Sequence, residues 1–155
     1  SFGVVNYKDR FCLIFETKKL IDVDFIISKL IKAIPKWLML LLYVRNIIAI
    51  IFSLKTGKIG NISKFTKSIN LKKGQFIGDI LIFLKDKNQL IAELCDKHLD
   101  FRFSILVKQE DEETKVYLSS IVTINNILGK IYFFFIKPFH RLIIPNVLKR
   151  LSGEI

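Results

Sequence analysis

The chain has 155 residues, of which 51% are hydrophobic and 25% charged, and its formal net charge is +11. This length fits one domain, residues 1–155, with a sizeable core, and the composition excludes intrinsic disorder. The positive charge favours contact with an anionic membrane or nucleic acid. Because the lysines are scattered and no Gly-aromatic RNA-binding signature is present, we expect no nucleic-acid partner.

The N-terminal sequence turns polar at Asn6, so we predict no signal peptide and a cytoplasmic location. Cys12 and Cys95 lie inside apolar runs without metal-ligand spacing, which predicts buried, reduced thiols and no metal site. The apolar segment 37–54 carries one central charge, Arg45, and an arginine there opposes membrane insertion. We therefore interpret 37–54 as a buried or interfacial helix.

The first elements are a strand and two short helices. Residues 7–16 are rich in aromatic and branched side chains, as strands are. Apolar residues recur at helical spacing over 23–34, a helix that Asp22 or Asp24 can cap. A second helix, over about 36–54, is apolar nearly all round, so we expect it to be covered on most sides, with Trp37 as a core anchor.

The second half of the chain predicts a meander and a long helix. Residues 55–74 form a long loop, with room for a short strand within 58–73. Regular spacing of further apolar runs predicts antiparallel neighbours, and the runs are 75–84, 90–96, 98–109 and 115–124. Asn125 or Asn126 caps a final helix to about residue 151, and Pro138 and Pro145 should kink or split it.

Alternation in 98–107 places two different rows on the two faces of one strand. The odd positions from Leu99 to Val107 are all apolar, whereas the even positions begin His98, Asp100 and Arg102. Two interpretations of the even row are open. In the first, His98 is a general base that Asp100 orients. In the second, the row forms ion pairs on the outer face of the sheet. Because the odd row is the better core, we favour the outside position.

Several strings together resemble a known family, namely PKW (35–37), LKTG (54–57), DKHLDFR (96–102), LGKIY (128–132) and PFHRLI (138–143). They resemble an uncharacterised bacterial domain-of-unknown-function family, number 2867, which is similar to the START-like, SRPBCC helix-grip superfamily. The resemblance covers about Tyr7 to Leu151. It implies an α+β fold in which a curved antiparallel sheet grips the C-terminal helix around an apolar cavity. It also implies a possible nucleotide-binding dehydrogenase-like partner domain, and no settled activity.

Three hypotheses about function follow. The first is a non-catalytic module that binds a hydrophobic or lipid-like molecule without a cofactor. The second is a cyclase or isomerase that uses His98 and Asp100. The third is a peripheral membrane protein that uses a cationic stripe, Lys130, Lys137 and Arg141, on the last helix. Apolar helix faces also allow a homodimer. The candidate ligand contacts are Trp37, Arg45, His98, Asp100, Arg102, Tyr132 and His140.

Overall fold

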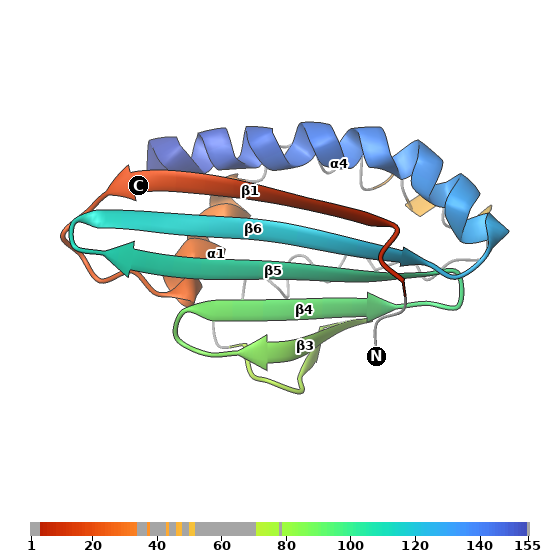
Figure 1. The fold of residues 1–155 in the computed structure, drawn as a ribbon, viewed down its shortest axis with the longest axis horizontal. Helices are drawn as coiled ribbons and strands as arrows, with labels where there is room; N and C mark the ends of the chain where they lie inside the picture. The colour runs from red at the N-terminus through yellow and green to blue at the C-terminus, as the bar shows by residue number, and fades with distance from the viewer. Residues whose placement is uncertain are drawn as a thin grey trace.

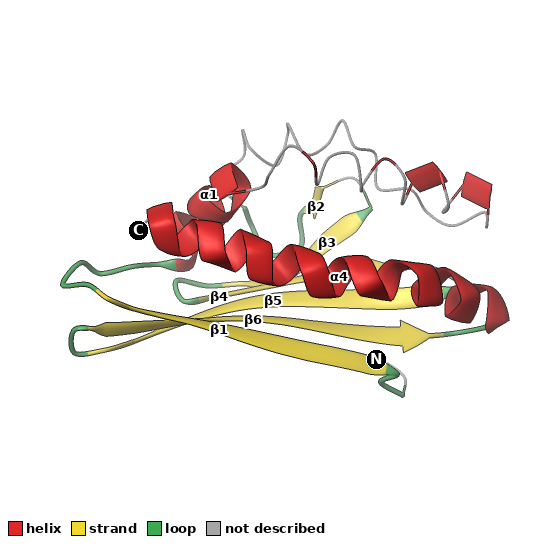
Figure 2. Cartoon of the chain, turned by 90° about the horizontal axis from the view of Figure 1, so that it is seen from above, coloured by secondary structure: helices red, strands yellow, loops and turns green. Residues whose placement is uncertain are grey.

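The fold is described from a computed structural model. The described residues are 4–33, 71–77 and 79–154, together with Trp37, Tyr43, Asn46, Ile47, Ile50 and Ile51. The elements are β1 (Tyr7–Glu16), α1 (Val23–Ala33), β2 (Phe76–Ile77), β3 (Ile80–Lys85), β4 (Gln89–Cys95), β5 (Leu99–Glu110), β6 (Glu113–Ile124) and α4 (Ile127–Glu154). An antiparallel sheet with α1 and α4 on one face makes an α+β fold (Figures 1 and 2).

The six strands of the described part lie in the order β1-β6-β5-β4-β3-β2, and every neighbouring pair is antiparallel. The predicted meander is therefore confirmed, and β1 joins it beside β6 (Figure 1). The run 75–84, predicted as one strand, forms two strands, β2 and β3, with Asp79 in a turn between them. Aspartate is a poor strand residue, which explains an interruption here.

α1 begins where the sequence predicts it. Asp22 caps the helix, since its carboxylate accepts a hydrogen bond of 2.8 Å from the backbone N–H of Phe25. Val23, Ile26 and Ile27 are buried on one side of the helix. On its first turn, Asp24 forms an ion pair of 2.8 Å with Lys85 of β3. The amphipathic pattern therefore fixes which side of α1 faces the sheet.

α4 is longer and less interrupted than the sequence predicts. Asn126 caps it, because its side-chain oxygen accepts a 3.0 Å hydrogen bond from the N–H of Gly129. The helix continues through Pro138 and Pro145 without the predicted split, and Figure 1 shows it bending at its N-terminal end. Both prolines are exposed. The carbonyls that they deprive of a donor can therefore bind water, which lowers the cost of the interruption.

The predicted second helix, 36–54, lies mostly outside the described residues. The six described residues in this range are helical. Their apolar side chains are exposed, which contradicts the expected cover at those positions: Trp37 42%, Tyr43 58%, Ile47 42%, Ile50 66% and Ile51 71%. Trp37 is therefore no core anchor. Within the described chain, no helix has the length and apolar character needed to cross a membrane.

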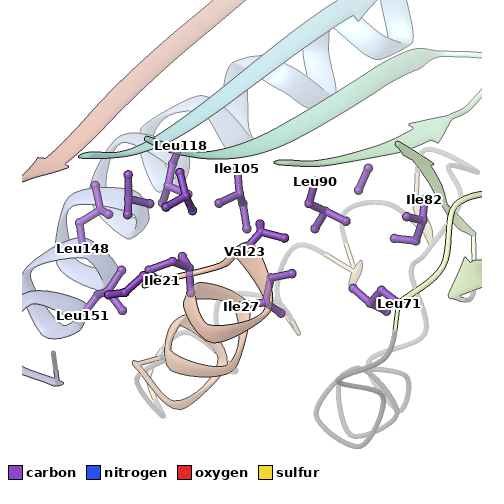
Figure 3. Close-up of a cluster of buried hydrophobic side chains, with 14 residues drawn as sticks. Ile21, Val23, Ile27, Leu71, Ile82, Leu90, Ile105, Leu118, Leu148 and Leu151 are labelled. Atoms are coloured by element: carbon purple, nitrogen blue, oxygen red, sulfur yellow. The ribbon is translucent and has the colours of Figure 1, made fainter. Parts of the chain in front are cut away.

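The buried apolar residues of the described part form two main clusters on the helix side of the sheet. The larger lies between α1, the C-terminal part of α4 and the sheet (Figure 3), where Val23, Ile105 and Leu151 meet. The smaller lies under the N-terminal part of α4, where Leu99 and Val122 meet Tyr132, Phe133 and Ile136. These clusters fix the position of α4 over β1 and β6.

Candidate functional site

The two rows of β5 lie on opposite faces, as the sequence predicts. Leu99, Ile105 and Val107 are buried on the face that carries the helices, here called the inner face. Phe101 and Phe103 share this face but are only partly buried. The even row therefore starts on the outer face, and this position separates it from the space between sheet and helices.

His98 does not belong to the even row, because β5 begins one residue later at Leu99. Its side chain is buried with 7% exposure. The imidazole Nδ1 lies 2.8 Å from the side-chain nitrogen of Asn126 and 3.0 Å from its oxygen. Its backbone oxygen accepts a 2.9 Å hydrogen bond from the N–H of Asn125. His98 thus fastens the β4–β5 turn to the first turn of α4.

Asp100 and Arg102 pair with groups other than His98. Asp100 accepts hydrogen bonds from the backbone N–H of Asp96, at 3.2 Å, and from the side chain of Asn125, at 3.3 Å. Arg102 forms an ion pair with Glu93, its partner across β4 and β5. No hydrogen bond between the described side chains joins His98 to Asp100. The base-and-orienter arrangement is therefore not formed, and the even row makes structural pairs.

The outer face also holds the two cysteines. Cys12 and Cys95 are exposed and form no disulfide, so the prediction of buried thiols is wrong. Each apolar run containing a cysteine alternates between the faces, and the cysteine falls on the outer one. Although Cys95 is exposed, partial desolvation of its thiol raises the pKa, and the nearby carboxylates of Asp100 and Glu93 raise the pKa further. A raised pKa reduces the fraction of thiolate, so Cys95 is poorly suited to nucleophilic chemistry.

A polar group interrupts the apolar inner face, and we name Tyr7, Asp9 and Ser120 the inner polar cluster. The Tyr7 hydroxyl donates a 3.1 Å hydrogen bond to the Asp9 carboxylate. Asp9 also accepts hydrogen bonds from the hydroxyl of Ser120 and, at 3.2 Å, from its backbone N–H. Asp9 and Ser120 face one another in the register of β1 and β6. A carboxylate with three donors is held in one fixed orientation.

α4 brings aromatic and cationic side chains to this cluster. The rings of Tyr7 and Phe133 lie 5.1 Å apart, and the Lys137 ammonium lies 5.3 Å from the centre of the Tyr7 ring. Burial raises the pKa of Tyr7, which the neighbouring Arg141 opposes and Asp9 reinforces. Tyr7 therefore keeps its proton over the usual range of pH and remains a hydrogen-bond donor.

Two of the predicted ligand contacts lie on the same side of the sheet as this cluster. Tyr132 is buried in the smaller apolar cluster, and the His140 ring lies 5.6 Å from the ring of Phe101. Arg45 lies outside the described residues, and Trp37 is exposed. Asp100 and Arg102 lie on the opposite face. Tyr132 and His140 therefore lie at the inner face, whereas Asp100 and Arg102 lie on the outer face and cannot share a site with them.

Sequence reasoning missed the inner polar cluster although the signal was present. The apolar row of β1 contains Asp9, and the apolar row of β6 contains Ser120. A single polar residue in a core row needs a partner, and pairing the two rows would have matched them. The described residues hold no group of three or more His, Cys, Asp or Glu side chains placed to bind a metal.

The chain is a single-sheet α+β protein, in which a long C-terminal helix lies over an antiparallel sheet and its polar cluster. The chain belongs to the family described as protein of unknown function DUF2867, whose family model matches residues 1–147. The resemblance drawn from the PKW, HLDF and PFHR strings is therefore confirmed at the level of this family. No curated protein and no solved structure matches the chain.

Proposed function

We propose that the chain is a non-catalytic binding module for a small amphipathic molecule held between the sheet and α4. The observation that carries this proposal is the partial burial of inner-face side chains between the two apolar clusters. Leu94, Phe101 and Phe103 are neighbours there in the register of β4 and β5, and each is only partly buried. Apolar side chains in the middle of a sheet's covered face are normally buried. A ligand that covers them would complete the layer.

The inner polar cluster supplies the polar end of such a site. Asp9 and Ser120 lie beside Phe103, since Ser120 is its partner across β5 and β6. Arg141 and Lys137 bring positive charge close to Tyr7. Few polar groups beside a largely apolar surface are typical of small-molecule sites. The combination favours a ligand with an alkyl or ring body and an anionic head, such as a carboxylate.

The proposal is non-catalytic because His98 and Asp100 contact other groups instead of one another. We place the chain in the START-like helix-grip superfamily as part of the same proposal, which the strand order and the long helix over the sheet support. We also propose a cytoplasmic location. Two exposed cysteines that form no disulfide are more compatible with a reducing compartment.

Binding of a fluorescent fatty acid, 11-(dansylamino)undecanoic acid, tests the proposal. We expect saturable binding that oleate displaces. Leu94→Trp should weaken binding about ten-fold because it fills the space over the inner face. Ile91→Trp, on the same strand but on the outer face, is the matched control and should leave binding unchanged. Absence of saturable binding, or equal effects of the two substitutions, would overturn the proposal.

A further inference from the structure

The side of α4 that faces away from the sheet carries a row of exposed apolar side chains. We name it the α4 stripe, and its members are Ile127, Leu128, Ile131, Phe134, Phe135 and Leu142. Ile127 is 75% exposed, Phe134 74% and Leu142 58%. The members are adjacent or are separated by three, four or seven residues, which places them on one side of a helix. The stripe is therefore a second apolar surface of α4, separate from the one that packs on the sheet.

The charges of α4 are all positive beside this stripe. From Ile127 to Gly153 the helix contains no aspartate or glutamate. Its basic residues are Lys130, Lys137, Arg141, Lys149 and Arg150, and all except Lys137 are exposed. An apolar stripe flanked by cations suits the interface of a bilayer that contains anionic lipid, where apolar side chains insert below the head groups.

We propose that α4 docks lengthwise on an anionic phospholipid bilayer, with the α4 stripe inserted among the lipid head groups. A second copy of the chain is a poorer occupant, because stacking two stripes brings the same cations together, and neither helix has an acidic residue between Ile127 and Gly153. The contact is in the plane of the membrane, which agrees with the absence of a spanning helix in the described chain. Lys137 and Arg141 also lie near Tyr7, but the apolar stripe is on the opposite side of α4 from the proposed ligand site. Substitutions in the stripe therefore test the membrane contact without changing the ligand site.

Co-sedimentation with vesicles tests the apolar part of the contact. We expect the wild-type chain to pellet with vesicles of 30% phosphatidylserine in phosphatidylcholine, and not with phosphatidylcholine alone. Phe134→Ser should weaken binding about ten-fold. Phe76→Ser is the matched control, since Phe76 is a phenylalanine of similar exposure, 66%, on β2. Both side chains are exposed, so neither substitution should affect folding.

The electrostatic part has its own matched pair. Replacing Lys130 and Lys149 by glutamine should weaken binding about 25-fold, at roughly five-fold for each lysine near the surface. Replacing the exposed Lys72 and Lys73 by glutamine removes the same charge away from α4 and should have little effect. The proposal is overturned if the wild-type chain does not bind anionic vesicles, or if the two double lysine substitutions weaken binding equally. A dimer in solution that Phe134→Ser dissociates would also overturn it and assign the stripe to a second copy.

Discussion

The inner and outer faces of the sheet use the same alternating strands for different purposes. On the inner face, apolar rows are buried against two helices, and the inner polar cluster satisfies its own hydrogen bonds. On the outer face, polar side chains pair across strands, as Arg102 does with Glu93. The comparison shows that the position of a charged side chain on the inner or outer face of the sheet decides whether it lies near the proposed ligand site. The type of residue matters less.

The largest expected difference between the faces comes from two neighbouring residues of β5. Ile105 is buried on the inner face, and Leu106 is partly buried on the outer face. Ile105→Ala should lower the free energy of unfolding by about 4 kcal/mol because it leaves a cavity in the core. Leu106→Ala should cost about 1 kcal/mol. Urea unfolding followed by circular dichroism measures both, and equal losses would contradict the assignment of the faces.

The close contact between the first turn of α4 and the β4–β5 turn depends on Gly129. A Cβ atom at this position would lie 2.1 Å from the backbone oxygen of His98. Gly129→Ala should therefore lower the free energy of unfolding by about 3 kcal/mol, since backbone must move to relieve the clash. Gly153→Ala, in the same helix with open space around it, is the control and should not destabilise the chain. Wild-type stability in the Gly129 variant would show that this contact does not fix the helix.

A smaller effect is expected from the outer-face ion pair. Arg102→Met leaves the buried carboxylate of Glu93 without its partner and should cost about 2 kcal/mol, less than a fully buried pair because Arg102 is partly exposed. Lys18→Met removes a pair with Glu112 in which both side chains are exposed, so its cost should be close to zero. The same urea titration compares them. Similar values for the two variants would mean that the outer face is more hydrated than its burial indicates.

The smallest effect concerns the pH dependence of the inner polar cluster. The pKa of Tyr7 is raised in the folded chain, so the folded state binds the phenolic proton more tightly than the unfolded state does. The stabilisation is complete below about pH 10, the usual tyrosine pKa, and is lost as pH rises through the higher folded value. Tyr7→Phe should therefore show a shallower loss of stability above pH 10. Identical slopes for the two proteins between pH 9 and 11 would contradict it.

Much of the fold was predictable because local patterns and tertiary packing agree. The alternation of 98–109 and the meander follow from short stretches of sequence. The same stretches limit each helix cap to two candidates, which include the observed caps Asp22 and Asn126. The strand β2 was merged with β3 in the predicted run 75–84, because a strand of two residues is too short to show a period of its own. The helix over 127–154 survives its prolines because both lie on its exposed side, a fact that depends on tertiary packing.

The candidate site was less predictable, for a reason visible at His98. The sequence pattern continues the strand back to this residue, but the strand starts at Leu99, and a side chain in the preceding turn does not follow the alternation of the strand. Tyr132 and His140 were predicted as ligand contacts on the last helix, and both lie on the side of α4 that packs on the sheet. Asp9 and Ser120 become a site only when β1 pairs with β6, and that pairing joins residues 111 positions apart. Local reasoning cannot establish so distant a partnership.

The position of β1 beside β6 affects how the chain is made. During synthesis β1 leaves the ribosome first, yet its neighbour is complete only after Ile124 has emerged. The hairpins from β3 to β6 can form from adjacent segments, whereas β1 must wait with both edges unpaired and its apolar row uncovered. We therefore expect the nascent chain to depend most on chaperones before β6 has been synthesised, because the apolar row of β1 is exposed until then.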